Sequence, residues 1–154
     1  MTTTPPTEVV LTREFDAPRE LVFEAFSRAE HVEKWIAPDG FTAQCVVEFH
    51  RGGTFSVRMI GYGMDHTARG KYVEIAPPEK IVWTMGFEDI PGHEMVTTAT
   101  FVARGEKTEL TVRQVFPRWD ALTPAQQELM RPRMGGAQEG WTQSLRHLGD
   151  FIKR

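Results

Sequence analysis

The residues that could carry chemistry are widely scattered in this chain of 154 residues. The five histidines, His31, His50, His66, His93 and His147, lie far apart, and no two have the i, i+4 spacing that places two metal ligands on one helix face. Distant residues can converge in a fold, so this spacing argues against a recognisable metal motif without excluding a site. Gly-x-Ser-x-Gly, Cys/His and phosphate-loop signatures are also missing. We therefore predict no catalytic residue, no metal site and no cofactor.

Tyr72 and Glu74 are the polar candidates for anchoring a ligand, with Arg58 as a third. Tyr72 and Glu74 share one side of a predicted strand with Gly70, and polarity does not decide which side faces inward, although a β-bulge could rescue either choice. If Tyr72 faces a cavity in a regular strand, Glu74 faces it too, and a carboxylate there needs a partner or a raised pKa. The alternative is an exposed position paired with a lysine or arginine.

Large aromatic and thioether side chains at alternating positions would line a cavity on the inner face of the predicted sheet. The alternative for each of them is ordinary core packing. Methionine and tryptophan adapt to varied ligands, and ligand pockets are mostly apolar with a few placed polar groups. The predicted ligand-binding residues are Trp35, Phe55, Met59, Tyr72, Glu74, Trp83, Met85, Phe101, Trp141 and Leu145.

Composition indicates one globular domain, with 40% hydrophobic and 25% charged residues. The net charge of −3 offers no basic field for nucleic acid, so we predict no nucleic-acid partner. Met1–Thr7 lacks the pattern of a secretory signal, and no apolar run is long enough to span a membrane, which favours a cytoplasmic protein. The single cysteine, Cys45, lies in a mostly apolar run and is expected to be a buried, inert thiol.

The first part of the chain predicts one strand and two short helices. Residues 1–7 are expected to form a flexible tail and residues 8–154 a single domain, beginning with a strand over Glu8–Glu14. Asp16-Ala17-Pro18 starts a helix, because proline suits a first helical turn. Ser27–Glu30 has the spacing of a capping box and opens a second helix, which ends at the turn Pro38-Asp39-Gly40.

Turn signals then recur at strand-length intervals and delimit six strands between about Phe41 and Phe116. Hairpin-length connections make the sheet antiparallel, since a parallel sheet would need crossover helices. One of these turns, at Pro91-Gly92, is flanked by Asp89 and His93, and it either lies at the mouth of a cavity or is an ordinary solvated loop.

A late apolar stripe predicts a long helix that packs against the sheet. The stripe lies in steps of three and four residues, which places its members on one helix face. Its members are Met134, Ala137, Trp141, Leu145, Leu148 and Ile152. Thr123-Pro124 is a good helix start, but Pro132 should break the helix, so we expect a short helical turn first and the main helix from about Met134 to Lys153. Gly135-Gly136 is then expected at the entry of this main helix.

This order of elements, with several short motifs, resembles the START and Bet v 1-like superfamily, and within it the domains similar to the activator of Hsp90 ATPase. The motifs are Ala17-Pro18 with Val22-Phe23, Trp35 and Pro38, Arg51–Phe55, Gly70–Glu74, Pro77-Pro78-Glu79 before Ile81 and Val82, and Gly140-Trp141 with Leu145 and Leu148. The resemblance implies an α+β helix-grip fold, a curved antiparallel sheet of about seven strands wrapped around a long C-terminal helix, with two short helices after the first strand. It also implies a cavity for apolar molecules between the long helix and the sheet.

The function we expect is the binding of a small hydrophobic molecule. A cyclase- or aromatase-like enzyme is the first alternative, but it requires a buried acid or base, and Glu74 is the only candidate. A co-chaperone-like or stress-response interaction module is the second. The co-chaperone itself carries a separate N-terminal domain for which this chain has no room. A homodimer is the commonest assembly for a protein of this kind.

Overall fold

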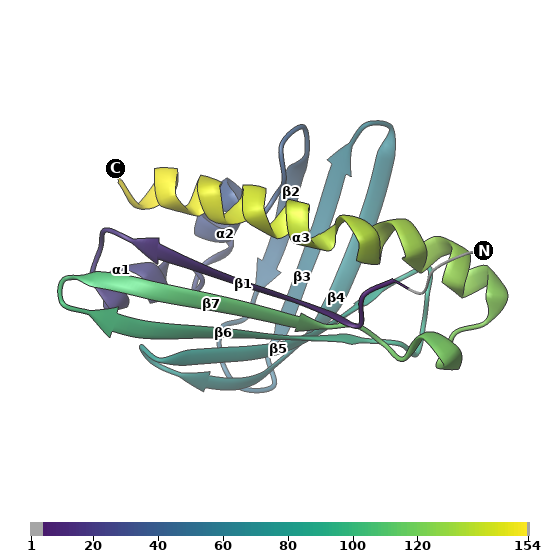
Figure 1. Ribbon diagram of the computed structural model, residues 1–154, viewed down its shortest axis with the longest axis horizontal. Coiled ribbons are helices and arrows are strands. Elements are labelled where there is room, and N and C mark those ends of the chain that lie inside the picture. Colours follow the sequence, from purple (N-terminus) through teal and green to yellow (C-terminus); the bar gives the residue numbers. More distant parts are fainter. Residues whose placement is uncertain (1–4, 154) are drawn as a thin grey trace.

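The computed structural model describes residues 5–153 as a curved sheet with one long helix lying across it (Figure 1). A strand and two short helices come first, then six strands, a 3-10 turn and the long helix. In order these are β1 (Glu8–Phe15), α1 (Arg19–Glu24), α2 (Ala29–Trp35), β2 (Thr42–Val47), β3 (Thr54–Gly61), β4 (Met64–Ala76), β5 (Lys80–Phe87), β6 (Met95–Arg104), β7 (Lys107–Val115), η1 (Trp119–Ala121) and α3 (Pro124–Ile152). The predicted α+β helix-grip fold is confirmed. Of the predicted tail, residues 1–4 lie outside the described residues.

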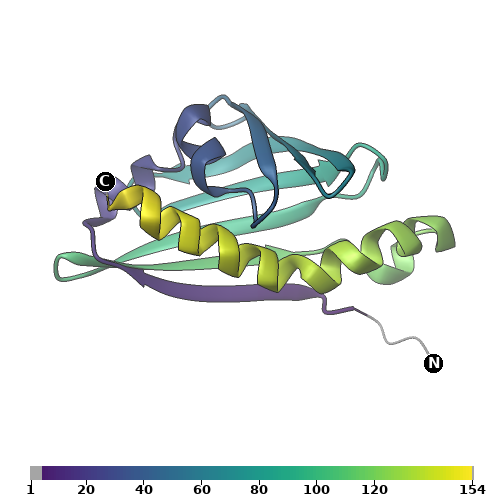
Figure 2. The same ribbon diagram turned by 90° about the horizontal axis from the view of Figure 1, so that it is seen from above.

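All strands join one sheet of seven strands in the order β1-β7-β6-β5-β4-β3-β2, with every neighbouring pair antiparallel. β2 to β7 follow one another by short connections, as the turn signals predict. β1 pairs with β7 from Glu8↔Val115 to Phe15↔Thr108, so the first and last strands of the chain lie side by side. The sheet is curved, and α3 crosses its concave face (Figure 2).

Alternation of side chains gives the concave face its apolar character. In β5, Ile81, Trp83 and Met85 are buried and the residues between them are partly exposed. Successive strand residues point to opposite faces, so one apolar row per strand is sufficient to build the inner surface. The alternation expected for β5 is confirmed.

A β-bulge interrupts the alternation in β4. Tyr72 pairs with Trp83, but Glu74 pairs with Val82, so β4 has one extra residue, Val73, relative to β5. The bulge leaves Tyr72 buried at 2% exposure while Val73 and Glu74 both lie on the outer face. Tyr72 therefore faces inward without Glu74, because the extra residue changes the face after Tyr72; this is the bulged alternative that the sequence left open.

The two short helices follow the prediction in position but differ in their caps. Pro18 is the N-cap of α1 rather than its first helical residue. The N-cap of α2 is Arg28, whose side chain makes no capping hydrogen bond. Ser27 instead donates through Oγ to the carbonyl oxygen of Glu24, at 2.7 Å, so the predicted capping box is wrong: the hydroxyl serves the end of α1 rather than the start of α2.

α3 is one continuous helix of 29 residues, which corrects the expected break at Pro132. Thr123 caps its start through a complete capping box with Gln126. Pro132 is exposed, so water can reach the carbonyl oxygen that its missing amide hydrogen leaves unpaired, and the helix bends along its length (Figure 2). Gly135 and Gly136 consequently lie inside the helix and not at its entry.

One half of the concave face is filled by α1, α2 and the C-terminal part of α3. Phe26 packs on Trp35 with ring centroids 4.6 Å apart and on Phe101 at 5.2 Å. Trp35 donates through Nε1 to the carbonyl oxygen of Ala25, and Leu145 is 2% exposed. Tight packing of this half leaves only the other half available for a ligand. Within residues 5–153, no helix has both the length and the apolar character needed to cross a membrane.

Candidate ligand-binding cavity

A cavity of about 540 Å³ lies between α3 and the other half of the concave face. Its floor consists of the inward residues of β3, β4 and β5, with single contributions from β6 and β7, and its roof is α3 from Glu128 to Ser144. The apolar lining residues are Ile36, Pro38, Phe41, Phe55, Val57, Met59, Met64, Ala68, Trp83, Met85, Phe87, Met95, Phe116, Leu129, Met130, Pro132, Ala137 and Trp141; the polar ones are His66, Gln114, Glu128, Arg133 and Ser144. Gly136 and Gly140 complete the lining.

Strand periodicity explains why these side chains meet. Phe55, Val57 and Met59 lie two residues apart on β3 and so point to the same face, as do Met64, His66 and Ala68 on β4. The register of the sheet places His66 opposite Met59. The floor is thus a patch of alternate residues at one end of the strands.

Methionine is concentrated in this cavity. Met59, Met64, Met85, Met95 and Met130 line it, which makes five of the seven methionines in the chain. The unbranched, polarizable thioether adapts to irregular shapes, so a wall of this kind can accommodate ligands of different outline.

Half of the predicted ligand-binding residues lie in the cavity wall, namely Phe55, Met59, Trp83, Met85 and Trp141. The structure brings these five together from β3, β5 and α3. Trp141 lies on the predicted apolar stripe of α3, of which Met134, Leu145 and Leu148 are fully buried.

Four further predicted residues lie in the filled half of the concave face and do not line the cavity. Trp35, Tyr72, Phe101 and Leu145 are each at most 2% exposed. Tyr72 on β4 and Phe101 on β6 face inward as the alternation predicts, whereas Trp35 on α2 and Leu145 on α3 belong to the helices that fill this half. Sequence periodicity identifies the inner face and cannot show which part of it the helices fill.

Tyr72 is nevertheless unusual, because its hydroxyl is buried without a hydrogen-bond partner among the described residues. Its ring stacks on Phe55 with centroids 5.2 Å apart and an interplanar angle of 6°. Burial raises the pKa of Tyr72 above its ordinary value, and Cys45 acts in the same direction. The hydroxyl therefore stays neutral.

Glu74 lies outside the cavity, on the convex face. Its carboxylate is 3.4 Å from Nζ of Lys80, and the side chain is 49% exposed. This is the exposed, lysine-paired arrangement that the sequence analysis gives as the alternative. Arg58 is also exposed and makes a bidentate pair with Asp65, at 2.9 and 2.7 Å. Neither group can act as a buried acid, base or anchor in the cavity.

Sequence reasoning missed the polar residues that do line the cavity, above all His66 and Arg133. Arg133 on α3 makes a bidentate ion pair with Asp89 in the β5–β6 loop, at 2.9 and 2.8 Å, and its Nη2 lies 3.3 Å from Nδ1 of His66. Asp89 thus lies beside the cavity wall. It belongs to the loop around Pro91-Gly92, for which the sequence left open a place at the cavity mouth or an ordinary solvated turn. The sequence did carry a signal for His66. It lies an even number of residues before Tyr72 on β4, so strand alternation places both side chains on the inner face.

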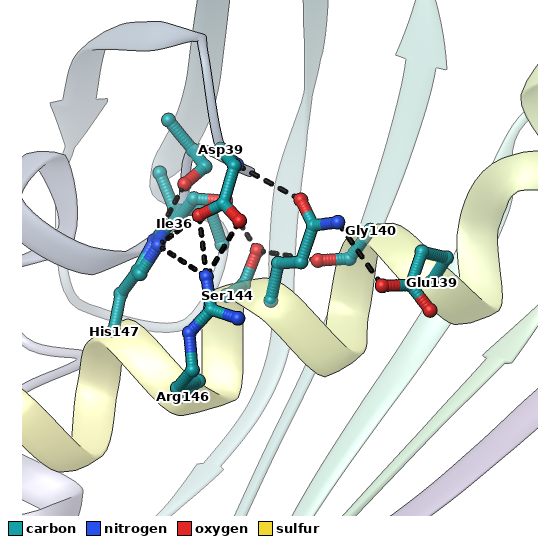
Figure 3. A network of polar contacts seen from close by, with 9 residues as sticks. Ile36, Asp39, Glu139, Gly140, Ser144, Arg146 and His147 are labelled. Carbon is teal, nitrogen blue, oxygen red and sulfur yellow. Dashed lines mark hydrogen bonds and ion pairs between the residues drawn. The ribbon is translucent and has the colours of Figure 1, made fainter.

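A second polar cluster joins α3 to the turn after α2 (Figure 3). Arg146 donates through Nη2 to both carboxylate oxygens of Asp39, at 2.5 and 2.6 Å, and Nε2 of His147 lies 2.7 Å from Oδ1. The backbone N–H of Asp39 donates to Gln143 at 2.9 Å. Hydrogen bonds from Arg146 and then His147 lower the pKa of Asp39 below its ordinary value.

Ser144 adds a buried link beside this cluster. Its hydroxyl contacts the carbonyl oxygens of Ile36, at 2.6 Å, and of Gly140, at 3.0 Å (Figure 3). Ile36, Gly140 and Ser144 all line the cavity. The cluster therefore holds one wall of the cavity in place, while the Asp89–Arg133 pair holds another.

Cys45 lies on β2, partly buried and away from the cavity lining. Its backbone N–H donates to the carboxylate of Glu33 at 2.8 Å. Burial, and then the charge of Glu33, raises the pKa of Cys45 to about 12. Within residues 5–153, no three His, Cys, Asp or Glu side chains form a group that could hold a metal ion.

Solved structures share this fold over nearly the whole chain. A Chromobacterium violaceum protein is 28% identical with a TM-score of 0.80, and the similarity covers 97% of this chain and 99% of that one. A Nitrosomonas europaea protein is 22% identical with a TM-score of 0.75, covering 96% and 94%. An Arthrobacter aurescens protein is 17% identical with a TM-score of 0.78, covering 96% and 86%. No curated protein matches the chain in sequence.

The family described as "Activator of Hsp90 ATPase homolog 1-like protein" matches residues 16–153. The match begins just before α1 and extends to the end of α3, so it includes every cavity-lining element. The resemblance drawn from the short motifs is confirmed. This chain is a member of the activator of Hsp90 ATPase homolog 1-like family.

Proposed function

We propose that this protein binds an apolar or aromatic small molecule in the cavity between α3 and the sheet. The observation that carries the proposal is the cavity itself, about 540 Å³ in volume and lined mainly by apolar side chains. Small-molecule sites typically have volumes of about 300–1,000 Å³ and a mostly apolar wall with a few polar groups. The remainder of the inner face is tightly packed, so the space is a local feature of the fold.

Apolar contact alone supports only weak binding here. A ligand that buries roughly 300 Å² of apolar surface gains about 7.5 kcal/mol at about 25 cal/mol per Å². Association costs several kcal/mol, so the remainder corresponds to weak affinity unless the cavity is preformed and supplies a polar anchor. The two ion-pair clusters that attach α3 to the rest of the domain favour a preformed cavity.

A fluorescence titration with N-phenyl-1-naphthylamine, an uncharged apolar fluorophore, tests the proposal. Trp83 and Trp141 line the cavity, so saturable binding should raise the emission of the probe and quench tryptophan fluorescence together. Native mass spectrometry of the purified protein should in addition detect a co-purifying ligand, if one is present, and would report the assembly size.

Two neighbouring glycines on α3 offer a matched pair of variants for this titration. Gly136 lines the cavity and Gly135 does not, yet both are exposed and a Cβ added at either meets no atom within 4 Å. Gly136→Phe should weaken binding by filling part of the cavity, and Gly135→Phe should leave it unchanged. Equal affinities in the two variants, or no saturable binding by the native protein, would contradict the proposal.

A further inference from the structure

Arg133 is held rigidly at the cavity wall by contacts on two sides. Its guanidinium makes the bidentate pair with Asp89, and Cζ lies 4.4 Å from the centroid of the Phe87 ring. The Arg133 side chain is only 15% exposed. A planar guanidinium fixed in this way presents its remaining hydrogens in a defined direction.

That geometry determines which nitrogen of His66 carries the hydrogen. Nη2 of Arg133 lies 3.3 Å from Nδ1 of His66. A guanidinium can only donate, so Nδ1 must accept, and the neutral imidazole then carries its hydrogen on Nε2. No described residue forms a hydrogen bond with Nε2. His66 therefore offers a free N–H donor.

The side chain of His66 is half-buried in the cavity lining, on the same face of β4 as Met64 and Ala68. Other polar groups of the wall have partners: Gln114 contacts Trp141 and Thr97, and Glu128, whose side chain is 78% exposed, lies 4.0 Å from Arg131. Ser144, as described, contacts backbone carbonyl oxygens. Apart from Arg133, whose guanidinium is engaged by Asp89, His66 has apolar neighbours in the wall: Met59 opposite it on β3, and Met64 and Ala68 on its own face of β4.

The local charge decides what kind of acceptor fits this donor. The carboxylate of Asp89 neutralises the guanidinium of Arg133, and neutral His66 adds no charge. An anionic ligand would therefore lose hydration here without meeting a net positive charge. A neutral acceptor, such as a carbonyl oxygen, carries a smaller desolvation cost and still satisfies the N–H.

We propose that the ligand is an apolar molecule bearing a neutral carbonyl group, a ketone or an ester, and that His66 positions it by donating from Nε2 to the carbonyl oxygen. This inference rests on the proposed function and specifies its ligand class. It makes His66 the residue that determines specificity, while the methionine-rich wall supplies the apolar contact.

A pair of ligands of equal shape tests the inference by calorimetric titration. In 2-isopropenylnaphthalene a methylene group replaces the carbonyl oxygen of 2-acetylnaphthalene. The native protein should bind the ketone about fivefold more tightly, which is the effect of one net neutral hydrogen bond. 2-Naphthoate, the anionic analogue, should bind no more tightly than the ketone.

Two variants separate the donor from the shape of the side chain. His66→Phe removes both nitrogens and should abolish the preference for the ketone, while the hydrocarbon still binds. His66→Gln keeps an acceptor for Arg133 and a donor for the ligand, so it should restore the preference. Thermal unfolding of both variants checks that each remains folded.

The tautomer is measurable without any ligand, through two-bond ¹⁵N–¹H correlations of the His66 ring in the native protein, and a hydrogen on Nδ1 would overturn the inference. Equal binding of ketone and hydrocarbon, tighter binding of 2-naphthoate, or a ketone preference that survives in His66→Phe would also overturn it and leave apolar binding in place. If neither naphthalene binds although N-phenyl-1-naphthylamine does, the inference fails alone; if none of the three binds, the proposed function fails with it.

Discussion

Cys45 shows how burial controls the reactivity of a single side chain. The thiolate is the reactive species, and the pKa of this thiol rises from an ordinary value of 9.0 to about 12. At pH 8, a rise of the pKa from 9.0 to about 12 lowers the thiolate fraction on the order of a thousandfold. We predict that Ellman's reagent reacts with Cys45 far more slowly in the native protein than in urea-unfolded chain. Equal rates would contradict the burial of the thiol.

Asp39 should respond to acid in a defined direction. Its folded-state pKa lies below the ordinary value of 3.8, because Arg146 and His147 hydrogen-bond to the carboxylate. The stabilisation from this group is thus fully present above pH 3.8 and is lost as the pH falls through the lower folded-state pKa. A ¹³C carboxyl NMR titration should place the midpoint for Asp39 below 3.8.

Arg146→Met provides the control for that titration. The variant removes the hydrogen bond that lowers the pKa of Asp39 most, so the midpoint should move up toward 3.8. An unchanged midpoint would show that the Arg146 contact is not maintained in solution. The test concerns the cluster that attaches α3 to the turn after α2 (Figure 3).

At the residue scale the sequence indicates faces better than roles. Alternation correctly placed Phe55, Trp83 and Met85 on the inner face, because strand geometry fixes which side each residue occupies. It failed for Glu74, because a bulge depends on the pairing of two strands and leaves no reliable mark in one of them. The donor role of His66 also depends on a residue 67 positions away, Arg133, which no local pattern reveals.

Pro132 is the element-scale feature with the clearest energetic consequence. Proline inside a helix is about 3 kcal/mol less favourable than alanine, although it also restricts the unfolded chain by about 0.4–1 kcal/mol. Pro132 is exposed, so Pro132→Ala removes little packing. We predict that the variant raises the free energy of unfolding by about 1–3 kcal/mol, measured by urea denaturation.

Gly135→Ala is the comparison for this measurement, since it changes helix propensity at a nearby exposed position without removing a kink. Its expected gain is about 0.5–1 kcal/mol. A Pro132→Ala gain no larger than that of Gly135→Ala would show that the helix has already relaxed around the proline.

Element order was predictable, but element ends were less so. Regular turn signals and alternation identified all six strands after the second helix, and the stripe from Met134 to Ile152 identified the packing face of α3. The break expected at Pro132 was wrong because propensity is a local rule, and the capping box at Thr123 and the packing of α3 on the domain outweigh it. The cap at Ser27 failed because a serine hydroxyl can serve either of two adjoining helices.

The whole molecule divides its concave face into a filled half and an open half. α1 and α2 lie near the C-terminal part of α3, and together these elements fill one half (Figure 1). The cavity occupies the other half, beneath the remainder of α3. Two polar clusters attach α3 to the domain, through Asp39 and through Asp89. This division could not be derived from the chain alone, because it depends on where two short helices lie on the sheet.

Methionine methyl NMR tests the central claim, that the open half is a ligand site, most directly. With ¹³C-methyl methionine and 2-acetylnaphthalene as the ligand, the methyl signals of Met59, Met64, Met85, Met95 and Met130 should shift in a saturable way, since these side chains line the cavity. Met134 is buried outside the lining and is the internal control, so its signal should move least. Unchanged signals from the five cavity methionines at saturating ligand, or shifts no larger than that of Met134, would contradict the account.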